Sequence, residues 1–353
     1  MVLLNLERKN ILIELNQDPE NVLRYIPKRE EKKSFLLVDE IQYLDDPANF
    51  LKRLYDEYSN DIKIIATGSS AFYIDKHFTD SLAGRKKIFE LSTLNFEEFL
   101  QFKNELELLK ELRDVKTGIK QKSVAAPKIW LALDEYINYG GYPAVVLENN
   151  MKDKLELLQE IRDSFVNRDI LESGIKDEIK FYRLMILLAG QTGNLVNISE
   201  LSNTLRLTNQ ETEQYLFVLQ KCFHISLVRP FYTNLRKELV KMPKLYFNDL
   251  GLRNILINYF SPIDQRADKG SLFENFVFRK LSENYTKDQI KFWRTADGNE
   301  IDFVMEDSNG KGKAIEVKFN EAEISWKKCK KFTEQYPEYP LKFYYWQSDD
   351  LLL

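Results

Sequence analysis

The stretch FLLVDEIQYL, residues 35–44, decides the fold of the first part of this chain. Its first four residues are all apolar, which is typical of a parallel strand buried on both faces, and two acids follow at once. A second apolar strand, Lys63–Thr67, comes after Phe50–Tyr58, whose apolar residues have helical spacing. Strands that alternate with helices in this way predict an α/β fold built on a parallel sheet.

The side chains at the ends of these two strands predict a nucleotide site. In proteins that hydrolyse nucleoside triphosphates, the first acid after such a strand helps to hold Mg²⁺, and the next can polarise the attacking water. Asp39 and Glu40 fit those two roles. Thr67 and Ser69 would place hydroxyl groups near the terminal phosphate as sensors, and Arg85 would stabilise charge in the transition state. The predicted cofactors are therefore ATP and Mg²⁺, and the alternative is an ordinary strand that ends in two solvated acids.

A strand of this kind normally works with a glycine-rich phosphate loop earlier in the chain, of the form G-x-x-x-x-G-K-[ST]. The printed sequence contains no such loop, and its first glycine, Gly68, comes after both acids. The backbone N–H groups and the lysine of that loop supply most of the grip on phosphate. The sequence thus carries the residues for metal and water without those that bind phosphate, and we expect weak nucleotide binding.

Four segments, in order along the chain, resemble one protein family. They are FLLVDEIQYL, KIIATGSSAF, SLAGRKKIFELSTLNFEEFL and INYGGYPAVV. With these segments the chain resembles the archaeal and bacterial AAA-type ATP-binding proteins, from Met1 to about Lys318. The resemblance implies a P-loop ATPase domain with Asp39 and Glu40 in the Walker B position. It also implies a C-terminal region of uncertain function, similar to a winged helix followed by a restriction-endonuclease-like fold, and action on nucleic acid or on a protein partner.

The chain departs from that family at its start. In the family, a first strand and its phosphate loop precede the strand that here opens the chain at Val2–Leu6. That first strand lies beside the strand ending at Thr67, so without it a row of unpaired backbone groups is left at an open sheet edge. We therefore expect a late start or a degraded gene, rather than a complete enzyme, to explain the missing loop.

A second set of charged residues lies near the C-terminus, on two predicted strands joined by a turn. Side chains alternate between the two faces of a strand. On the second strand this places Glu316 and Lys318 on one face, and the other face receives Ile315, Val317 and Phe319.

On the first of these strands, Glu300–Glu306, the same alternation leaves Asp302 free. The residues that it buries together are Ile301, Phe303 and Met305. Asp302 followed by Glu316-x-Lys318 matches the PD-(D/E)xK pattern of nucleases, and Glu274 on the preceding helix is a further candidate ligand. In such sites carboxylates hold Mg²⁺ or Mn²⁺, and the lysine positions or deprotonates the attacking water. The alternative is an ordinary hairpin with a charged, solvated face.

Residues 179–265 predict a helix-turn-helix followed by a wing. The candidate recognition helix starts at Asn209 and carries Glu211 and Glu213 in its first turn, where they would repel phosphates. The hairpin after it is better suited to nucleic acid, because its basic residues can lie along a phosphate backbone. These residues are Arg229, Arg236, Lys237, Lys241 and Lys244. A structural or protein-binding winged helix is the alternative.

Length and composition set the remaining expectations. We expect an incomplete AAA-type ATPase-like domain at 1–115, a helical linker at 116–178, the winged-helix-like domain at 179–265 and the restriction-endonuclease-like domain at 266–353. A net charge of −4 excludes a general attraction to nucleic acid or anionic membranes. Two cysteines are too few for a disulfide framework or a zinc site. No apolar stretch reaches the roughly 18 residues of a membrane span, and the expected location is the cytoplasm.

Overall fold

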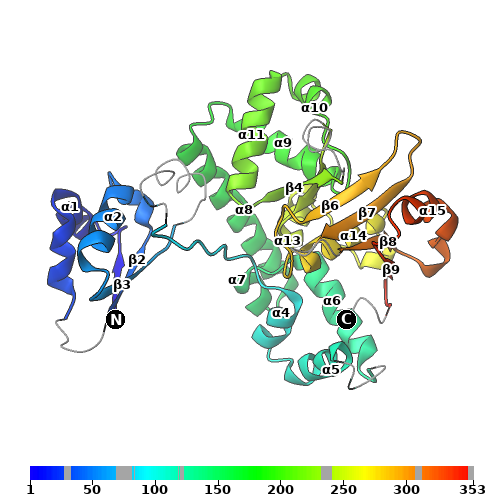
Figure 1. The fold of residues 1–353 in the computed structure, drawn as a ribbon, viewed down its shortest axis with the longest axis horizontal. Coiled ribbons are helices and arrows are strands. Elements are labelled where there is room, and N and C mark those ends of the chain that lie inside the picture. Colours follow the sequence, from blue (N-terminus) through cyan, green and yellow to red (C-terminus); the bar gives the residue numbers. More distant parts are fainter. Residues whose placement is uncertain are drawn as a thin grey trace. The chain divides into compact units, whose positions relative to one another are not determined.

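The computed structural model describes residues 1–27, 33–68, 82, 84–117, 119, 123–231, 241–306 and 312–348, without the side chains of residues 166–169 and 171–172. The chain divides into two compact units. The first comprises Met1–Leu91 together with Lys221–Phe223, and the second comprises Ser92–Gln220 and His224–Leu353. Both units combine helices with strands, which confirms the mixed α/β class (Figure 1).

The first unit is built on a three-stranded parallel sheet in the order β1-β2-β3. Its elements, in chain order, are β1 (Val2–Asn5), α1 (Lys9–Gln17), η1 (Pro19–Tyr25), β2 (Ser34–Asp39), η2 (Ile41–Tyr43), α2 (Pro47–Tyr58) and β3 (Ile62–Ala66). α2 begins after Asp46, whose carboxylate accepts a hydrogen bond from the N–H of Asn49 at 2.9 Å. Proline at the first helical position adds to this start signal, because its missing N–H would have no partner there.

The helices of this unit pack on one face of its sheet. Leu36 and Val38 are buried there, against apolar residues of α1, η1 and α2. The opposite face carries Leu3, Phe35 and Ile65, which are 65%, 48% and 45% exposed. The prediction that residues 35–38 are buried on both faces is therefore wrong, because α1 and α2 cover the same face.

The second unit begins with a helical region. Its helices are α4 (Phe96–Phe102), α5 (Leu106–Lys116), α6 (Ala126–Tyr139), α7 (Pro143–Leu147), α8 (Met151–Ser173), α9 (Glu178–Gly190), α10 (Ile198–Leu205) and α11 (Asn209–Lys221). Gly140 and Gly141 form a sharp turn between α6 and α7. Gly140 has a φ of +77°, and a Cβ there would lie 2.2 Å from the Asp249 carboxylate, so this position requires glycine. The Gly141 N–H donates to Asp249 at 2.9 Å and fastens the turn to the start of α13 (Leu250–Ile257).

A six-stranded mixed sheet occupies the rest of the second unit, in the order β5-β4-β6-β7-β8-β9. The strands are β4 (Ile225–Pro230), β5 (Lys244–Phe247), β6 (Ile290–Arg294), β7 (Glu300–Glu306), β8 (Gly312–Lys318) and β9 (Leu341–Tyr345). β4 pairs antiparallel with β5 and parallel with β6. The hairpin predicted as a wing and the C-terminal strands therefore belong to one continuous sheet. The predicted strand Glu300–Glu306 is confirmed by β7.

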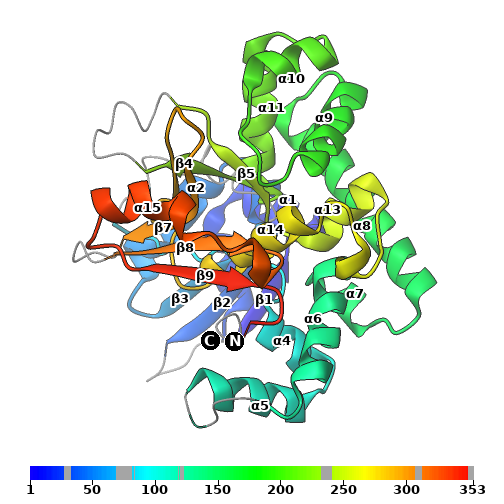
Figure 2. The same ribbon diagram turned by 90° about the vertical axis from the view of Figure 1, so that its right-hand side faces the viewer.

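Helices cover both faces of this larger sheet (Figure 2). On one face, Phe278 of α14 (Lys269–Leu281) stacks on Tyr246 of β5, with ring centroids 4.7 Å apart. On the other face, Phe332 of α15 (Trp326–Gln335) meets Trp293 of β6 edge to face, at 5.3 Å. Burial on both faces leaves the side chains of the central strands little contact with water.

β7 contains a bulge at the position of a predicted site residue. The pairing of β6 with β7 shifts register between Lys291 and Trp293, where one residue of β6 faces two of β7, Asp302 and Phe303. The extra residue reverses the alternation of side chains along the strand. Phe303 packs in the cluster that contains α14, whereas Ile301 packs in the cluster that contains α15. The prediction that Ile301 and Phe303 share a buried face is wrong for this reason.

Candidate functional site

Asp39, at the end of β2, lies beside side chains from both neighbouring strands. The Thr67 hydroxyl, directly after β3, donates to Asp39 Oδ1 at 2.5 Å, and the Asn5 amide, at the end of β1, donates to Oδ2 at 3.4 Å. The three residues meet because the carboxyl ends of parallel strands share one edge of a sheet. The structure thus brings Asp39 and Thr67 together. It adds Asn5, which the sequence analysis did not predict. The one feature of the sequence that could have indicated Asn5 is its position at the end of a strand.

Glu40 follows Asp39 in a turn with left-handed backbone geometry, φ 57° and ψ 50°. Residues that carry a Cβ seldom adopt this conformation, and here it turns the chain from β2 into η2. The Gln42 amide donates a hydrogen bond to the Glu40 carboxylate. The N–H of Ile41 donates to the carbonyl of Thr67 at 3.0 Å. These contacts hold the two acids at the same edge of the sheet as Thr67.

The oxygen atoms at this edge fit a hydrated magnesium ion. Mg²⁺ is usually bound by one or two carboxylates and completes its shell with water and substrate phosphate oxygens. Asp39 and Thr67 offer a carboxylate and a hydroxyl group from adjacent strands, and Glu40 adds a second carboxylate. The groups at this edge are therefore of the types that Mg²⁺ uses as ligands.

The other two residues predicted for this site are placed differently. The Arg85 guanidinium donates to the carboxylate of Asp56 on α2, at 2.7 Å, and both side chains are more than a third exposed. Arg85 therefore has its ion-pair partner on α2 rather than at the ends of β2 and β3. Ser69 lies outside the described residues.

Asp302, Glu316 and Lys318 lie together at the bulge of β7. The N–H of Asp302 donates to Glu316 Oε2 at 3.3 Å, and the N–H of Val317 donates to Asp302 Oδ2 at 2.9 Å. Lys318 Nζ donates to Glu316 Oε1 at 2.5 Å. Asp302 is only 7% exposed, so the expectation that it is free is wrong. Its carboxylate instead joins β7 to β8, because it accepts a backbone hydrogen bond beyond the last regular pair of the two strands.

Lys244, the first residue of β5, enters the same cluster from the other side of Asp302. Its ammonium group donates to Glu274 Oε1 at 3.0 Å and to Asp302 Oδ1 at 3.2 Å, and it forms an ion pair with Glu300. The Tyr246 hydroxyl also donates to Glu274, at 2.5 Å. The structure thus brings all four predicted residues of this site together around Asp302 and adds Lys244.

The burial of Lys244 corrects the basic patch predicted for the hairpin. Its side chain is 3% exposed, because β5 is a strand of the six-stranded sheet and packs against α14. Arg229 on β4 and Lys241 before β5 are exposed, whereas Arg236 and Lys237 lie outside the described residues. Local sequence cannot reveal this difference, since a lysine in a basic segment predicts a surface position unless its distant acidic partners are known.

The electrostatics of the cluster follow from its burial. Burial, followed by the nearby charge of Asp302, raises the pKa of Glu274 to about 7 and the pKa of Glu316 to about 8. Burial alone would lower the pKa of Lys244. The carboxylates around it, Glu274 first, outweigh that effect and hold its pKa well above the ordinary value. At neutral pH Lys244 is therefore an ammonium ion inside the protein.

This cluster, with the Lys244 ammonium group in place, does not fit a divalent metal ion. Such an ion needs several oxygen ligands that converge on one point. In the part of the chain that the structure describes, no group of three or more His, Cys, Asp or Glu side chains is placed to hold a metal ion. Lys244 lies between Glu274 and Asp302, and both oxygens of Glu316 accept protein hydrogen bonds. We therefore derive no chemistry through a metal at this site.

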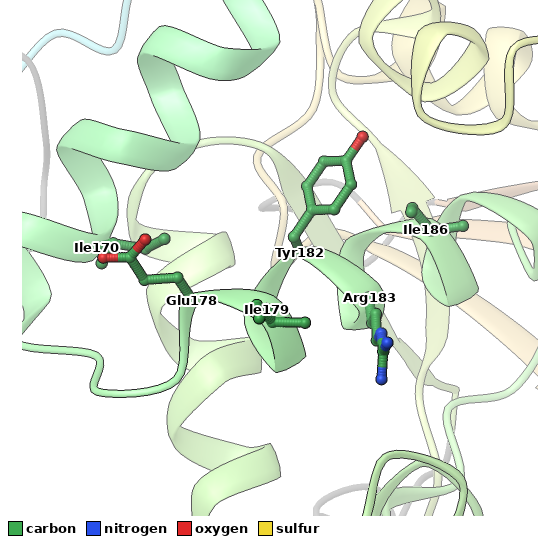
Figure 3. A pocket seen from close by; sticks show the side chains of 6 residues that line it. All are labelled: Ile170, Glu178, Ile179, Tyr182, Arg183 and Ile186. Atoms are coloured by element: carbon green, nitrogen blue, oxygen red, sulfur yellow. The ribbon is translucent and has the colours of Figure 1, made fainter.

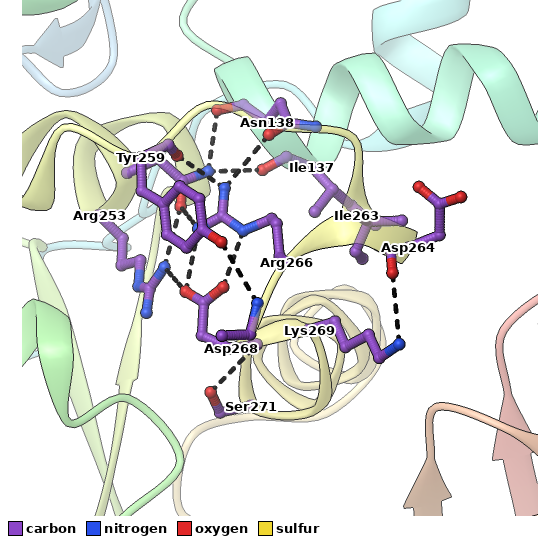
Figure 4. A network of polar contacts seen from close by, with 12 residues as sticks. Ile137, Asn138, Arg253, Tyr259, Ile263, Asp264, Arg266, Asp268, Lys269 and Ser271 are labelled. Carbon is purple, nitrogen blue, oxygen red and sulfur yellow. Dashed lines mark hydrogen bonds and ion pairs between the residues drawn. The ribbon is translucent and has the colours of Figure 1, made fainter.

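Two buried polar networks fix the helix that carries Glu274. Asn275 accepts from the N–H of Phe247 and donates to the carbonyl of the same residue, both at 2.8 Å, which fastens α14 to β5. At the start of α14, Asp268 lies between Arg253 and Arg266 (Figure 4). Because these bonds hold the helix at its start and along its length, the position of Glu274 beside Lys244 is set by the surrounding fold.

The acidic start of α11 has a structural use. Glu211 accepts hydrogen bonds from the N–H and the hydroxyl of Thr208, each at 2.8 Å. The Thr208 hydroxyl accepts from the N–H of Glu211 at 3.1 Å. This reciprocal pair is a capping box. The negative charge that sequence reasoning set against phosphate binding therefore stabilises the helix itself.

A hollow of about 390 Å³ lies between the end of α8 and the first turns of α9 (Figure 3). Its lining residues are Ile170, Glu178, Ile179, Tyr182, Arg183 and Ile186. None of the residues predicted for a site lines it. Its largely apolar wall offers no arrangement of carboxylates comparable to the clusters described above.

Comparisons with known proteins match the chain to three family models. Residues 1–100 match an AAA domain, residues 130–262 match a domain of unknown function (DUF8612), and residues 269–350 match another domain of unknown function (DUF4143). The first match includes Asp39, Glu40 and Thr67. Residues 1–100 are thus similar to an AAA domain, whereas the models matched by the rest of the chain have no stated function.

The curated relatives are themselves uncharacterized. A protein of Methanocaldococcus jannaschii is 28% identical over 303 residues, which cover 83% of this chain and 63% of the relative. A protein of Haemophilus influenzae is 28% identical over 295 residues, with 82% and 66% covered. A protein of Mycobacterium tuberculosis is 24% identical over 286 residues, with 80% and 58% covered. The chain thus spans less than two thirds of the length of each of these relatives.

No solved structure matches the chain. Among the helices of the described residues, none combines the length and apolar character needed to cross a bilayer.

Proposed function

We propose that this chain is an ATP-binding protein of the AAA type, with the nucleotide site at the carboxyl edge of the three-stranded sheet. One observation carries the proposal: Asp39, Thr67 and Asn5 converge at that edge, within residues 1–100 that match an AAA domain. A bound Mg²⁺ ion would supply positive charge to the terminal phosphates. Asp39 is the residue that would hold it.

The remaining residues at the edge have roles that follow from their groups. Glu40 carries a second carboxylate, which would orient a water molecule toward the terminal phosphate. The Thr67 hydroxyl donates to Asp39 and would report on the phosphate by exchanging that partner for a phosphate oxygen. Asn5 keeps Asp39 in place from β1. Because the glycine-rich phosphate loop is not part of the printed sequence, we expect binding by this chain to be weak.

Calorimetric titration of the 353-residue chain with ATP, with and without Mg²⁺, tests this function. We expect Mg²⁺-dependent heat that Asp39→Asn removes and that Asp45→Asn, a change at an exposed acid of the same unit, leaves unchanged. Glu40→Gln should retain binding while it removes hydrolysis. A second titration uses the chain extended by any in-frame upstream codons. Absence of Mg²⁺-dependent binding in both forms would overturn the proposal.

For the second unit, we propose a role in binding nucleic acid or a partner protein. The exposed Arg229 and Lys241 support contact with a phosphate backbone. Loss of salt-sensitive binding to DNA in an Arg229→Glu, Lys241→Glu double variant would support this partner class. Unchanged binding in the variant, or no binding by the wild-type chain, would favour a protein partner or a structural module.

Phosphodiester cleavage is a second candidate function for the second unit, and the convergence of Glu274, Asp302, Glu316 and Lys318 favours it. The Lys244 ammonium between Glu274 and Asp302 opposes the metal-dependent form of that activity. An assay of cleavage of single-stranded, double-stranded and branched DNA, with Asp302→Asn and Lys318→Ala as controls, tests whether the chain has this activity. Cleavage that both variants abolish would establish the activity, and no cleavage of any substrate would exclude it.

A further inference from the structure

We propose that the ammonium group of Lys244 occupies the position that a divalent metal ion would take among the carboxylates of the cluster. The cluster binds such an ion only when that ammonium group is removed by substitution. The inference goes beyond the nucleotide function proposed for the first unit. It does not require DNA cleavage, because it concerns only which cation the carboxylates hold.

The first support is the geometry around the ammonium group. Lys244 Nζ contacts three carboxylates, Glu274 at 3.0 Å, Asp302 at 3.2 Å and Glu300. They come from two different elements, α14 and β7, so the group bridges a helix and a strand. Carboxylates that gather around one point inside a protein need a positive charge among them. Here that charge is supplied by the chain itself.

The second support is the way the fold fixes Lys244. The residue pairs with Val228 within the sheet and with Leu195 through an isolated bridge. Asn275 fastens the other end of β5 to α14 through the two bonds with Phe247. The side chain also lies over the ring of Phe292, at 5.7 Å, with its charge surrounded by protein. The position of the ammonium group is therefore fixed by backbone pairing and by packing.

The third support is that the carboxylate oxygens toward the centre of the cluster already accept hydrogen bonds from protein groups. Glu274 Oε1 accepts from both Lys244 and Tyr246. Asp302 accepts from Lys244 with one oxygen and from the N–H of Val317 with the other. A metal ion would have to displace the ammonium group, since the two cations would otherwise share Glu274 and Asp302 at close range. Without that group, the carboxylates would face one another with no counter-charge and would become ligands for an added cation.

The test measures Mn²⁺ binding to the full chain by electron paramagnetic resonance, without nucleotide. All proteins carry Asp39→Asn, so the first unit contributes no carboxylate at that position. We expect no site in the protein with Lys244 intact and none with Lys244→Arg, which keeps the charge. Lys244→Met, which keeps the length of the stem, should gain one stoichiometric Mn²⁺ site that the protein with Lys244 intact lacks. Adding Asp302→Asn to Lys244→Met should remove the site again.

Two results would overturn the inference. One is stoichiometric Mn²⁺ binding with Lys244 intact that Asp302→Asn abolishes, which would restore the metal-dependent nuclease candidate. The other is a folded Lys244→Met protein that gains no site. If Lys244→Met does not fold, divalent ions should restore its native tryptophan fluorescence, and failure to do so would equally contradict the inference. ATP binding by the first unit is measured separately, so neither result bears on the nucleotide function.

Discussion

Asp39 and Asp302 are both acids on β-sheets, and the two units of the chain use them in opposite ways. Asp39 ends a strand and is held by two neutral groups, the Thr67 hydroxyl and the Asn5 amide. Asp302 lies within a strand, at a bulge, and is held by the Lys244 ammonium and the N–H of Val317. An acid with neutral partners at a sheet edge keeps its charge available for a ligand. An acid with a buried cation as its partner has its charge neutralised by the protein.

The sheets around these two acids explain the difference. The three-stranded sheet is packed by helices on one face, and residues such as Leu3 and Phe35 remain exposed on the other. The six-stranded sheet is covered on both faces by α14 and α15. Charges near its centre are therefore removed from water and must find partners within the protein. The surroundings of an acid, rather than its place on a strand, therefore decide whether its charge is available to a ligand.

Asp302→Ala should lower the free energy of unfolding far more than Asp39→Ala. Asp302→Ala leaves the buried Lys244 with one carboxylate fewer and the N–H of Val317 without its acceptor, so we expect it to destabilise the second unit by about 3–5 kcal/mol. Asp39→Ala removes one hydroxyl and one amide contact at a sheet edge, and we expect a loss below about 1 kcal/mol. Urea denaturation of each full-length variant gives both values.

The two units can be followed separately in that experiment. The chain has four tryptophans, Trp130, Trp293, Trp326 and Trp346, and all belong to the second unit. Tryptophan fluorescence therefore reports the second unit, while far-ultraviolet circular dichroism reports both. Equal losses for the two variants, or a larger loss for Asp39→Ala, would show that the contrast between the two acids is not a contrast in burial.

The buried ion pairs of Asp268 should make the second unit sensitive to acid. Burial alone would raise the pKa of Asp268, but Arg266 and Arg253 outweigh it and lower the value to about 2. A carboxyl group whose pKa is lower in the folded state stabilises the fold above its unfolded pKa, near 4, and this contribution disappears as the pH falls toward 2. The shift corresponds to about 2 kcal/mol. We expect tryptophan fluorescence to report this loss between pH 4 and pH 2.

Asp268→Asn is the control for the acid prediction. It removes the titrating group, so the variant should be less stable at neutral pH but should lose about 2 kcal/mol less than the wild type on acidification. The arginines at this site are almost fully buried, at 1% and 0% side-chain exposure, which is why their partner matters. A wild-type curve and a variant curve that fall in parallel between pH 4 and pH 2 would contradict this account.

Local sequence patterns predicted the elements around both acids. The apolar runs identified β2 and β3, and alternation identified β7 with its correct bounds. On β8, Ile315 and Val317 share one core cluster, as the period of two requires. These features depend on neighbours in the sequence, and a pattern can therefore reveal them.

The rest of the candidate site depends on contacts between distant residues. The bulge at Asp302 arises from pairing with β6, so nothing in the sequence of β7 alone predicts that Ile301 and Phe303 face opposite sides. The burial of Lys244 depends on Glu274 and Asp302, which belong to later elements. A basic segment predicts a surface patch, whereas the packing of β5 against α14 buries one of its lysines.

The ion pair between Arg85 and Asp56 lies at the surface of the first unit, unlike the buried ion pairs of the second unit, and its loss should change stability least. Both side chains are more than a third exposed, so water and salt screen their attraction. Arg85→Ala should therefore change the stability of the first unit by less than about 0.5 kcal/mol, and 0.5 M salt should remove most of that change. Circular dichroism during urea denaturation, beside Asp56→Ala, measures it. A loss above about 1 kcal/mol that salt does not reduce would mean that Arg85 stabilises this unit through contacts other than the ion pair, and the contrast between exposed and buried charges would weaken.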